Sequence, residues 1–595
     1  MRPTGDAQLS PHAPYTDTPT EHQGWAGGLG GIRRTLPAEE RKLGDRRVVL
    51  PLAVGLALAL AFLLRLSAAE HLSPHVDEAA SVLAAHALVE RGVPILPSGT
   101  VYLQGATLSY LLAPFVWLGA GGLDNLAAMR FVSVLSGTVA VYLAYRLGRT
   151  VTSDPHVGVL TGLLVAIDPV SVQWSGHVRM YGLLQTLTFA LAWIFVRALV
   201  IPPSWPLVAG LVVVFWAAVF THIGAALLWP AMALTTGLIH RRSLLGRWRR
   251  LGGALALSLL APFVLIALNS LLGSASVGGA TAAPGPFLTF VGDNLLAPLG
   301  RLRPGSTSPD WAALFRDGNL AWLGPALLVA CSSLIAGRSY LIDSREALDL
   351  RRRHATTALL PLYWVPVIAV GIFTVSPKER YLLHVHLLGY VLVAAVALEL
   401  LTRQPATRSG MDWLGRIAVY GFAPVAVASL LAGLTWRFDH PVVHPDHTAA
   451  LEYVVEHRAP GEPVIVALPA VAYLALGNRD DLLFLAGPED GPRAQRYTRL
   501  AVDGRLVDYW VGVEAIVSPA KLRKTLAAHP GAWVVVDKER LGASWAYAGP
   551  MADAIRATTD TVYEAPGGAL VLRASPITSD AVLVAGCGCA GVLPW

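Results

Sequence analysis

The stretch VVLPLAVGLALALAFLLRLSA, residues 48–68, is the first of many long apolar runs in this chain of 595 residues. A helix that crosses roughly 30 Å of hydrocarbon needs about 20 mostly apolar residues, and this stretch meets that requirement. Ten further runs do so, at about 128–149, 157–173, 180–197, 205–221, 223–239, 252–272, 319–337, 355–374, 382–401 and 412–434. The sequence therefore predicts an α-helical polytopic membrane protein with about eleven spans.

The composition agrees with this prediction and excludes several classes of protein. Hydrophobic residues make up 54% of the chain and charged residues only 14%, whereas an ordinary soluble domain carries roughly a quarter charged residues. A mainly soluble enzyme, a disordered scaffold and a nucleic-acid-binding protein are therefore excluded. The expected surroundings are a lipid bilayer.

The run at about 102–119 decides the topology, because every later helix inverts if it crosses the membrane. Short basic loops stay in the cytoplasm. If residues 102–119 lie along the outer surface, the clusters of Arg and Lys in 33–47, 146–149, 241–250, 338–353 and 403–416 all face the cytoplasm. We therefore expect the N-terminus inside and the C-terminus outside. Residues 69–127 then form a long first outer loop with one or two interfacial helices, and 273–318 form another outer loop.

The two ends of the chain differ from the apolar middle. Residues 1–47 are rich in Pro, Gly, Thr and charged residues without an apolar period, which predicts a disordered cytoplasmic arm. Residues 437–595 carry 14 basic and 18 acidic side chains and are therefore acidic, whereas the whole chain is basic, with 46 basic and 40 acidic side chains. In this region short β-rich runs at 464–468, 515–518, 533–536, 561–564 and 569–572 alternate with helical stretches such as 519–528 and 550–557. The sequence predicts a transmembrane domain over 48–436 and an extracytoplasmic α/β domain over 437–595.

The most informative residues are Asp77 and Glu78, which follow the first span at the predicted outer surface. Adjacent carboxylates at a bilayer edge are costly unless they have a function or meet water. A plain structural explanation also exists: acidic side chains favour the first turn of a helix, and an Ala-rich helix follows.

Two basic sites lie at the same predicted face. Arg179, in the segment from Trp174 to Tyr181, precedes a span, and its charge is unfavourable at a helix N-terminus. It therefore calls for an anionic partner: a lipid headgroup, a bound phosphate or a carboxylate. Lys378 and Arg380 lie in an outer loop that should be poor in bases. They form either a phosphate clamp or a solvated turn.

These motifs together resemble those of the GT-C superfamily of integral-membrane glycosyltransferases. That superfamily includes protein O-mannosyltransferases, aminoarabinose transferases and bacterial transferases of lipid-linked sugars. The similarity rests on Asp77-Glu78 in a long first outer loop, on Arg179-Met180-Tyr181 after the third span, and on Arg380-Tyr381-Leu382-Leu383 entering a late span. It covers about 48–435 and implies a GT-C-like fold.

The resemblance implies roles for the individual residues. Asp77 would be the catalytic base that takes the proton from the acceptor hydroxyl, with Glu78 as its helper. Arg380, Lys378 and Arg179 would bind the phosphate of a polyprenyl-phosphate sugar donor. The pocket would be completed by Tyr181, Tyr381 and His177, the last of which stands where many relatives carry an acid.

No cofactor is clearly required, although a divalent metal is an open alternative. His75, Asp77 and Glu78 are the candidate ligands for it, but nothing in the sequence defines their geometry. His222 is expected to be a packing histidine. His384 and His386 should point to different faces of a helix and would chelate poorly, and Cys587 and Cys589 have no assigned role. The Gly-rich segment 273–286 is read as a linker or a lid.

The sequence thus predicts a membrane glycosyltransferase that moves a sugar from a polyprenyl phosphate to an acceptor hydroxyl on the outer face. The acceptor is a glycan, a glycolipid or a protein, and the expected location is the plasma membrane of a bacterium. The alternative is a polytopic transporter of a lipid or anionic solute. A transporter should carry ionisable residues in the middle of broken helices, whereas the acids here lie at the outer edge.

Overall fold

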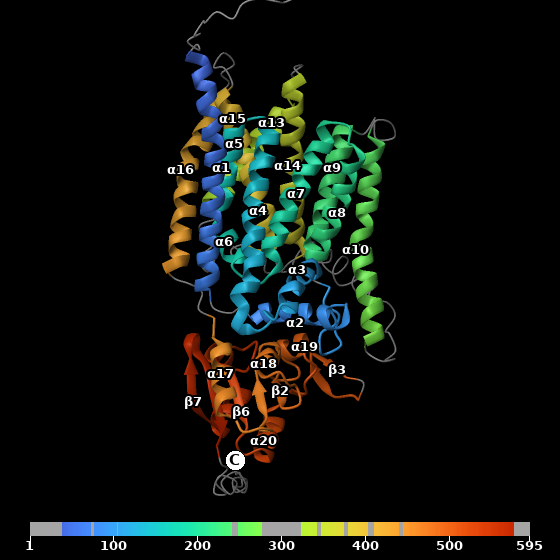
Figure 1. Ribbon diagram of the computed structural model, residues 1–595, viewed down its shortest axis with the longest axis vertical. Helices are drawn as coiled ribbons and strands as arrows, with labels where there is room; N and C mark the ends of the chain where they lie inside the picture. Colours follow the sequence, from blue (N-terminus) through green and yellow to red (C-terminus); the bar gives the residue numbers. More distant parts are fainter. Residues whose placement is uncertain are drawn as a thin grey trace, which may run out of the picture. The chain divides into compact units, whose positions relative to one another are not determined.

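The computed structural model describes residues 38–72, 76–103, 105–240, 248–276, 323–341, 347–373, 379–402, 410–439, 444–501 and 503–575 (Figure 1). The chain divides into two compact units after Val49. The second unit, from Leu50 onward, holds every element described below except the beginning of the first helix.

Each of the eleven predicted runs falls on a helix or a pair of helices. They are α1 (Ala38–His71), α4 (Leu126–Thr152), α5 (Pro155–Ile167) with α6 (Pro169–Ser175), α7 (Met180–Val200), α8 (Trp205–Thr221), the short helix Ile223–Leu227 with α9 (Leu228–His240), α10 (Arg249–Ser276), α13 (Leu323–Leu341), α14 (Ala347–Phe373), α15 (Glu379–Thr402) and α16 (Gly410–Asp439). α1 begins at Ala38, so it includes the end of the predicted N-terminal arm; residues 1–37 lie outside the described ranges.

Length and hydropathy identify the chain as a multi-pass membrane protein. Within the described ranges, six helices are long and apolar enough to cross a membrane, and α5 with α6 would make a seventh despite a bend of 63°. Shorter apolar helices cover 205–221, 324–335 and 354–370. The polytopic helical fold is therefore confirmed, while the count of eleven spans stays a prediction.

The segment predicted to be the first outer loop contains two helices, α2 (Val76–Arg91) and α3 (Ala106–Trp117). α3 occupies the run that decides the topology. Its 12 residues extend about 18 Å at 1.5 Å per residue, which is too short to cross the hydrocarbon.

Close packing of α4 against α5 is possible because glycines face the contact. A Cβ atom added at Gly148 would lie 2.8 Å from Thr161 Oγ1, and one at Gly158 would lie 2.7 Å from the Tyr145 carbonyl oxygen. Small residues of this kind allow membrane helices to approach closely. α4 also packs along α7, so α4, α5 and α7 form one closely packed group.

The bend between α5 and α6 follows from Asp168 and Pro169. Pro169 has no backbone N–H, so the carbonyl of Val165 loses its usual helical donor. The buried Arg65 of α1 replaces it: Nη2 donates to the Val165 oxygen at 3.1 Å, and Nη1 to the Ala166 oxygen at 3.2 Å. Asp168 caps α6 by accepting from the Ser171 N–H at 2.7 Å. The bend directs the end of α6, with Trp174, toward the N-terminus of α7.

The C-terminal region is an α/β domain, as predicted. Its main sheet has six strands in the order β5-β2-β1-β6-β8-β7. β1 pairs in parallel with β2 and β6, β2 pairs in parallel with β5, and β8 is antiparallel to β6 and β7. The strands are β1 (Val464–Val466), β2 (Leu482–Leu485), β5 (Ala515–Ile516), β6 (Trp533–Asp537), β7 (Thr559–Ala565) and β8 (Ala569–Ala574), and a separate pair is formed by β3 (Thr498–Leu500) and β4 (Leu506–Asp508).

Within the described ranges, six α-helices accompany the strands of this domain. They are α17 (His447–His457), α18 (Pro469–Leu476), α19 (Pro492–Tyr497), α20 (Pro519–Ala528), α21 (Lys538–Gly542) and α22 (Pro550–Thr558). The domain also contacts the first outer loop. Ala79 and Leu83 of α2 belong to the same buried apolar cluster as Val466 and Phe484, and the Ser98 hydroxyl donates to the Tyr509 carbonyl at 2.6 Å. α2 is thus held between the membrane helices and the α/β domain.

Candidate active site

The neighbouring carboxylates Asp77 and Glu78 occupy the first turn of α2 but have different surroundings. Glu78 is 1% exposed, whereas the side chain of Asp77 is 35% exposed. Successive side chains on a helix point about 100° apart, so one carboxylate is directed to the core and the other to a cleft.

Glu78 forms a bidentate ion pair with the buried Arg130 of α4. Arg130 Nε donates to Glu78 Oε1 at 3.0 Å, and Arg130 Nη2 donates to Oε2 at 2.8 Å. The backbone N–H of Val178 donates to the same carboxylate at 2.6 Å, and His177 Nδ1 lies 3.5 Å from it. Burial alone would raise the pKa of Glu78, but His177 and Arg130 outweigh it and hold this pKa well below its ordinary value. Glu78 is therefore ionised and ties α2 to α4 and to the segment before α7.

Arg130 also joins α1 to this contact. Its Nη1 donates to the carbonyl oxygens of Ala69 at 2.6 Å and Leu72 at 2.9 Å. These carbonyls belong to the end of α1, where the helix supplies no further donors. One guanidinium thus connects α1, α2 and α4 directly beside the candidate site.

Asp77 faces Arg179, the residue that precedes α7. Arg179 Nη2 lies 3.2 Å from Asp77 Oδ2, and Nη1 donates to the Asp77 carbonyl at 3.0 Å and contacts the Tyr102 hydroxyl at 3.3 Å. The anionic partner that the sequence required for Arg179 is therefore a carboxylate of the first outer loop. Asp77 remains partly exposed in spite of this contact.

Arg380, at the start of α15, approaches the same place. Its guanidinium lies 5.6 Å from the ring centre of Trp174 and 5.6 Å from that of Tyr381, both within the range of a cation–π contact. Trp174 packs edge-on against Tyr181 at 4.8 Å. The charges of Arg179, Arg380 and Asp77 all act on the Tyr181 hydroxyl. The structure thus brings together Asp77, Arg179, Arg380, Tyr181 and Tyr381, which are separated by up to 304 residues in sequence.

Two histidines border this cationic site. His222 Nδ1 accepts from the Gly224 N–H at 3.1 Å, and its ring lies 5.9 Å from that of Tyr181. His222 therefore caps a helix turn, in keeping with the packing role expected of it, while also facing the site. His384 is buried, and neither of its ring nitrogens has a hydrogen-bond partner among the described residues.

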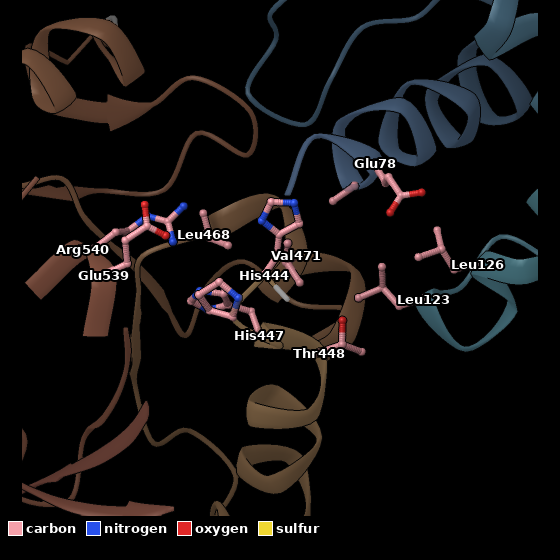
Figure 2. Close-up of a pocket in the computed structure, with 12 residues that line it drawn as sticks. Glu78, Leu123, Leu126, His444, His447, Thr448, Leu468, Val471, Glu539 and Arg540 are labelled. Carbon is pink, nitrogen blue, oxygen red and sulfur yellow. The ribbon is translucent and has the colours of Figure 1, made fainter. Parts of the chain in front are cut away.

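A cleft opens beside Asp77, between α2 and the C-terminal domain. It has a cavity volume of about 90 Å³, is open to solvent on one side, and is lined by Asp77, Arg493, Trp510, Arg540 and Trp545, among others. A second pocket, with a cavity volume of about 70 Å³, is lined by Glu78, His444, His447, Glu539 and Arg540 (Figure 2).

The candidate metal ligands are only partly described, because His75 lies outside the described ranges. In those ranges no group of three His, Cys, Asp or Glu side chains has the arrangement of a metal site. Asp77 and Glu78 bind different arginines. Lys378, Cys587, Cys589 and the Gly-rich segment beyond Ser276 also lie outside the described residues.

Sequence reasoning missed Arg130, Trp174 and Tyr102 as parts of the site. Arg130 had a usable signal: it is a basic residue at the outer end of an apolar run, on the side that should be poor in bases. Trp174 and Tyr102 had none, since aromatic residues are common at membrane interfaces.

Solved structures resemble this chain over most of its length. ArnT from Cupriavidus metallidurans, bound to undecaprenyl phosphate, is 15% identical, with a TM-score of 0.52 over 88% of this chain and 98% of that chain. The apo form of ArnT is 14% identical, with a TM-score of 0.52 over 90% and 100%. The oligosaccharyltransferase AglB from Archaeoglobus fulgidus is 13% identical, with a TM-score of 0.49 over 89% and 74%. A comparison with curated protein sequences gives no match.

The chain therefore has the fold of the GT-C superfamily of membrane glycosyltransferases, which confirms the resemblance inferred from the motifs. Residues 105–266 of the 595 match the model of the family of dolichyl-phosphate-mannose-protein mannosyltransferases. The match extends from α3 into α10 and contains Arg130, Trp174 and Arg179, but ends well before Arg380.

Proposed function

We propose that this protein transfers a sugar from a polyprenyl-phosphate carrier to an acceptor hydroxyl at the membrane surface. The observation that carries the proposal is the convergence of one partly exposed carboxylate, Asp77, with the two arginines Arg179 and Arg380 at one end of a GT-C fold. A carboxylate can accept a proton, while guanidinium groups stabilise a departing phosphate.

In the proposed reaction, Asp77 removes the proton from the acceptor hydroxyl. The hydroxyl oxygen forms a bond to the anomeric carbon, and the bond from that carbon to the phosphate oxygen breaks. The polyprenyl phosphate leaves with the electron pair. Asp77 suits this role better than Glu78, because Glu78 is fully buried and already accepts three hydrogen bonds.

Glu78 then has a positioning role. Through Arg130 and the Val178 N–H it holds the segment that carries Arg179 against α2. Arg179 in turn binds both the carboxylate and the backbone carbonyl of Asp77. The orientation of the proposed base therefore depends on its neighbour in sequence.

Arg380 is the proposed principal ligand of the donor phosphate, assisted by Lys378 and Arg179. Its Nε is buried and makes no hydrogen bond within the described residues, and a bound phosphate would supply the acceptor that this nitrogen lacks. Trp174, Tyr181 and Tyr381 provide the apolar and aromatic walls of this pocket. The nature of the carrier is supported by ArnT, which has been crystallised with undecaprenyl phosphate.

The proposed location is the inner membrane of a bacterium, with the N-terminus in the cytoplasm and the α/β domain outside. This orientation rests on the distribution of Arg and Lys among the loops. A polyprenyl-phosphate donor on the outer face agrees with it.

The test is complementation followed by mass spectrometry of outer-face glycans, glycolipids and glycoproteins. Cells lacking the gene receive wild type, Asp77→Asn or Glu90→Gln. Glu90 is an exposed carboxylate on the same helix, so Glu90→Gln is a matched control. Asp77→Asn should lower transfer by about two to four orders of magnitude, which is the usual contribution of general-base catalysis.

Three outcomes decide the assignment. If a well-expressed Asp77→Asn protein transfers sugar at a near-normal rate, Asp77 has only a structural role in the first turn of α2. If a chelator abolishes wild-type activity and one divalent ion restores it, Asp77 is a metal ligand and not the base. Unchanged glycans in cells without the gene, with a changed distribution of a lipid or anionic solute, would favour the transporter.

A further inference from the structure

We infer that the cleft beside Asp77 is the acceptor site, and that the acceptor is a sugar-containing molecule carrying an oxyanion, a phosphate or a carboxylate. The inference rests on the proposed function and deepens it by naming a substrate class. It starts from the lining of the cleft, which joins the proposed base to Arg493 and Trp510 of the α/β domain.

The first observation is the N-terminus of α18, at Leu468–Ala470 on the wall of the cleft. The first N–H groups of a helix have no partner inside it and form the positive end of its dipole. Here the capping position is Leu468, whose side chain cannot accept a hydrogen bond. The Ala470 N–H is therefore available to an anion in the cleft.

The second observation is Arg493 of α19, which lines the same cleft although it is only 5% exposed. Its Nη2 donates to the Ala467 carbonyl oxygen, immediately before α18. Its guanidinium lies 5.4 Å from the ring centre of Phe484, 5.7 Å from that of Tyr497 and 5.4 Å from that of Tyr547. Its Nε makes no hydrogen bond, and none of the ion pairs in the described part of the chain involves it.

A buried cation without a carboxylate is costly, and among the described residues the guanidinium of Arg493 has only neutral partners, the Ala467 carbonyl and the Tyr547 hydroxyl. An anion bound in the cleft would supply the missing counter-charge. Arg540, the other cation of the cleft, differs because Asp537 already binds it. The uncompensated positive charge thus lies at Arg493 and the start of α18. An oxyanion there would receive a charged guanidinium donor and a backbone N–H together.

The third observation is the aromatic lining, which suits the faces of sugar rings. Trp510 stacks on Tyr497 at 5.1 Å, and Trp545 is 42% exposed. The loop of Trp510 is rigid because the buried Asp508 accepts from the N–H groups of Trp510, Val511, Gly512 and Val513. Rigid aromatic side chains bind at low entropic cost, so the cleft is pre-organised.

The position of Asp77 in this cleft links binding to the reaction. An acceptor whose oxyanion lies at Arg493 can present a hydroxyl to the Asp77 carboxylate. That hydroxyl loses its proton to Asp77 as it bonds to the anomeric carbon of the donor, while the carrier phosphate leaves toward Arg380. Two separate cationic sites would thus bind the two anionic substrates.

The test measures binding of small probes to the full-length protein in phosphatidylcholine nanodiscs, by calorimetry. The probes are glucose 6-phosphate, glucuronate, neutral glucose and, in parallel, a polyprenyl phosphate. The variants are Arg493→Gln, Arg493→Lys and Arg380→Ala. Arg556→Gln is the control, because Arg556 is an exposed arginine of the same domain, and among the described residues its ion pair is with Asp553.

We expect glucose 6-phosphate or glucuronate to bind wild type at least tenfold more tightly than glucose. Arg493→Gln should weaken that binding about ten- to a hundredfold, Arg493→Lys should retain part of it, and Arg380→Ala and Arg556→Gln should leave it unchanged. The variants should affect polyprenyl-phosphate binding in the opposite way: Arg380→Ala should lose this binding, and the Arg493 variants should keep it.

Several results would overturn the inference. Equal affinity of wild type for glucose and its phosphate would do so even if the Arg493 variants fail to fold. Loss of probe binding in Arg380→Ala alone would assign the probe to the donor site. Displacement of the probe in phosphatidylglycerol nanodiscs would assign the cleft to lipid headgroups. Failure of the proposed function has a different signature, namely no binding of the polyprenyl phosphate to wild type.

Discussion

Replacing Glu78 with Gln tests the buried ion pair that organises the site. Gln is nearly isosteric and can still accept from Arg130 Nε and the Val178 N–H through one oxygen. Its amide nitrogen, however, would face Arg130 Nη2, a donor that now lies 2.8 Å from Glu78 Oε2. Two donors then oppose each other, and the buried charge of Arg130 loses its counter-charge.

Breaking a buried ion pair by removing one partner costs about 3–5 kcal/mol. That range corresponds to roughly two to three and a half orders of magnitude in the ratio of folded to unfolded protein. We therefore expect Glu78→Gln to unfold at a temperature several degrees below wild type in detergent. Glu90→Gln, on the same helix, should unfold with wild type.

A double variant separates the ion pair from the other contacts of Arg130. Replacing both partners by apolar residues is often tolerated. The double variant with Glu78→Met and Arg130→Met should therefore be more stable than the sum of the two single destabilisations predicts. Recovery should be incomplete, because Arg130 also binds the carbonyl oxygens of Ala69 and Leu72. If the two single losses of unfolding free energy simply add in the double variant, Glu78 and Arg130 do not stabilise each other.

The pH dependence gives an independent check. The pKa of Glu78 in the folded protein lies well below its ordinary value of 4.5, because His177 and Arg130 outweigh the effect of burial. A lowered pKa stabilises the fold fully above 4.5, and that stabilisation is lost as the pH falls below it. The difference in unfolding temperature between wild type and Glu78→Gln should narrow as the pH falls from about 5 to about 3. A constant difference, or no difference at pH 7, would refute the reasoning.

Two further predictions concern the donor site and the topology. Arg380→Ala should weaken binding of a polyprenyl phosphate about ten- to a hundredfold, and Arg380→Lys should restore only part of it, since a point charge lacks the guanidinium fork; equal dissociation constants in calorimetry would remove Arg380 from the site. In a protein whose three native cysteines are replaced by Ser, Tyr110→Cys should react with an impermeant thiol reagent in intact cells, and Ser153→Cys, in the exposed turn after α4, only after permeabilisation. Labelling of Ser153→Cys in intact cells would contradict the proposed orientation.

Much of the fold was predictable from local patterns. Apolar runs placed the helices because a bilayer demands a continuous apolar length. The bend at Asp168–Pro169 was not predicted, since 157–173 was expected to be one span, although the missing N–H of proline explains it. In the C-terminal domain the expected strands at 533–536 and 569–572 correspond to β6 and β8. β2 was missed because its sequence, Leu482–Leu485, is apolar throughout and lacks alternation.

The sequence by itself determined that this is a polytopic helical protein with an α/β domain, and that Asp77, Arg179 and Arg380 are candidates for one site. Only the tertiary structure decided which of two adjacent carboxylates is buried. The partners of Glu78 lie 52 and 100 residues away, and no local pattern encodes a pairing at that distance. The same holds for Arg493: an arginine on a short helix is unremarkable in sequence, and it becomes a binding-site candidate because folding buries it, without a carboxylate, beside Asp77.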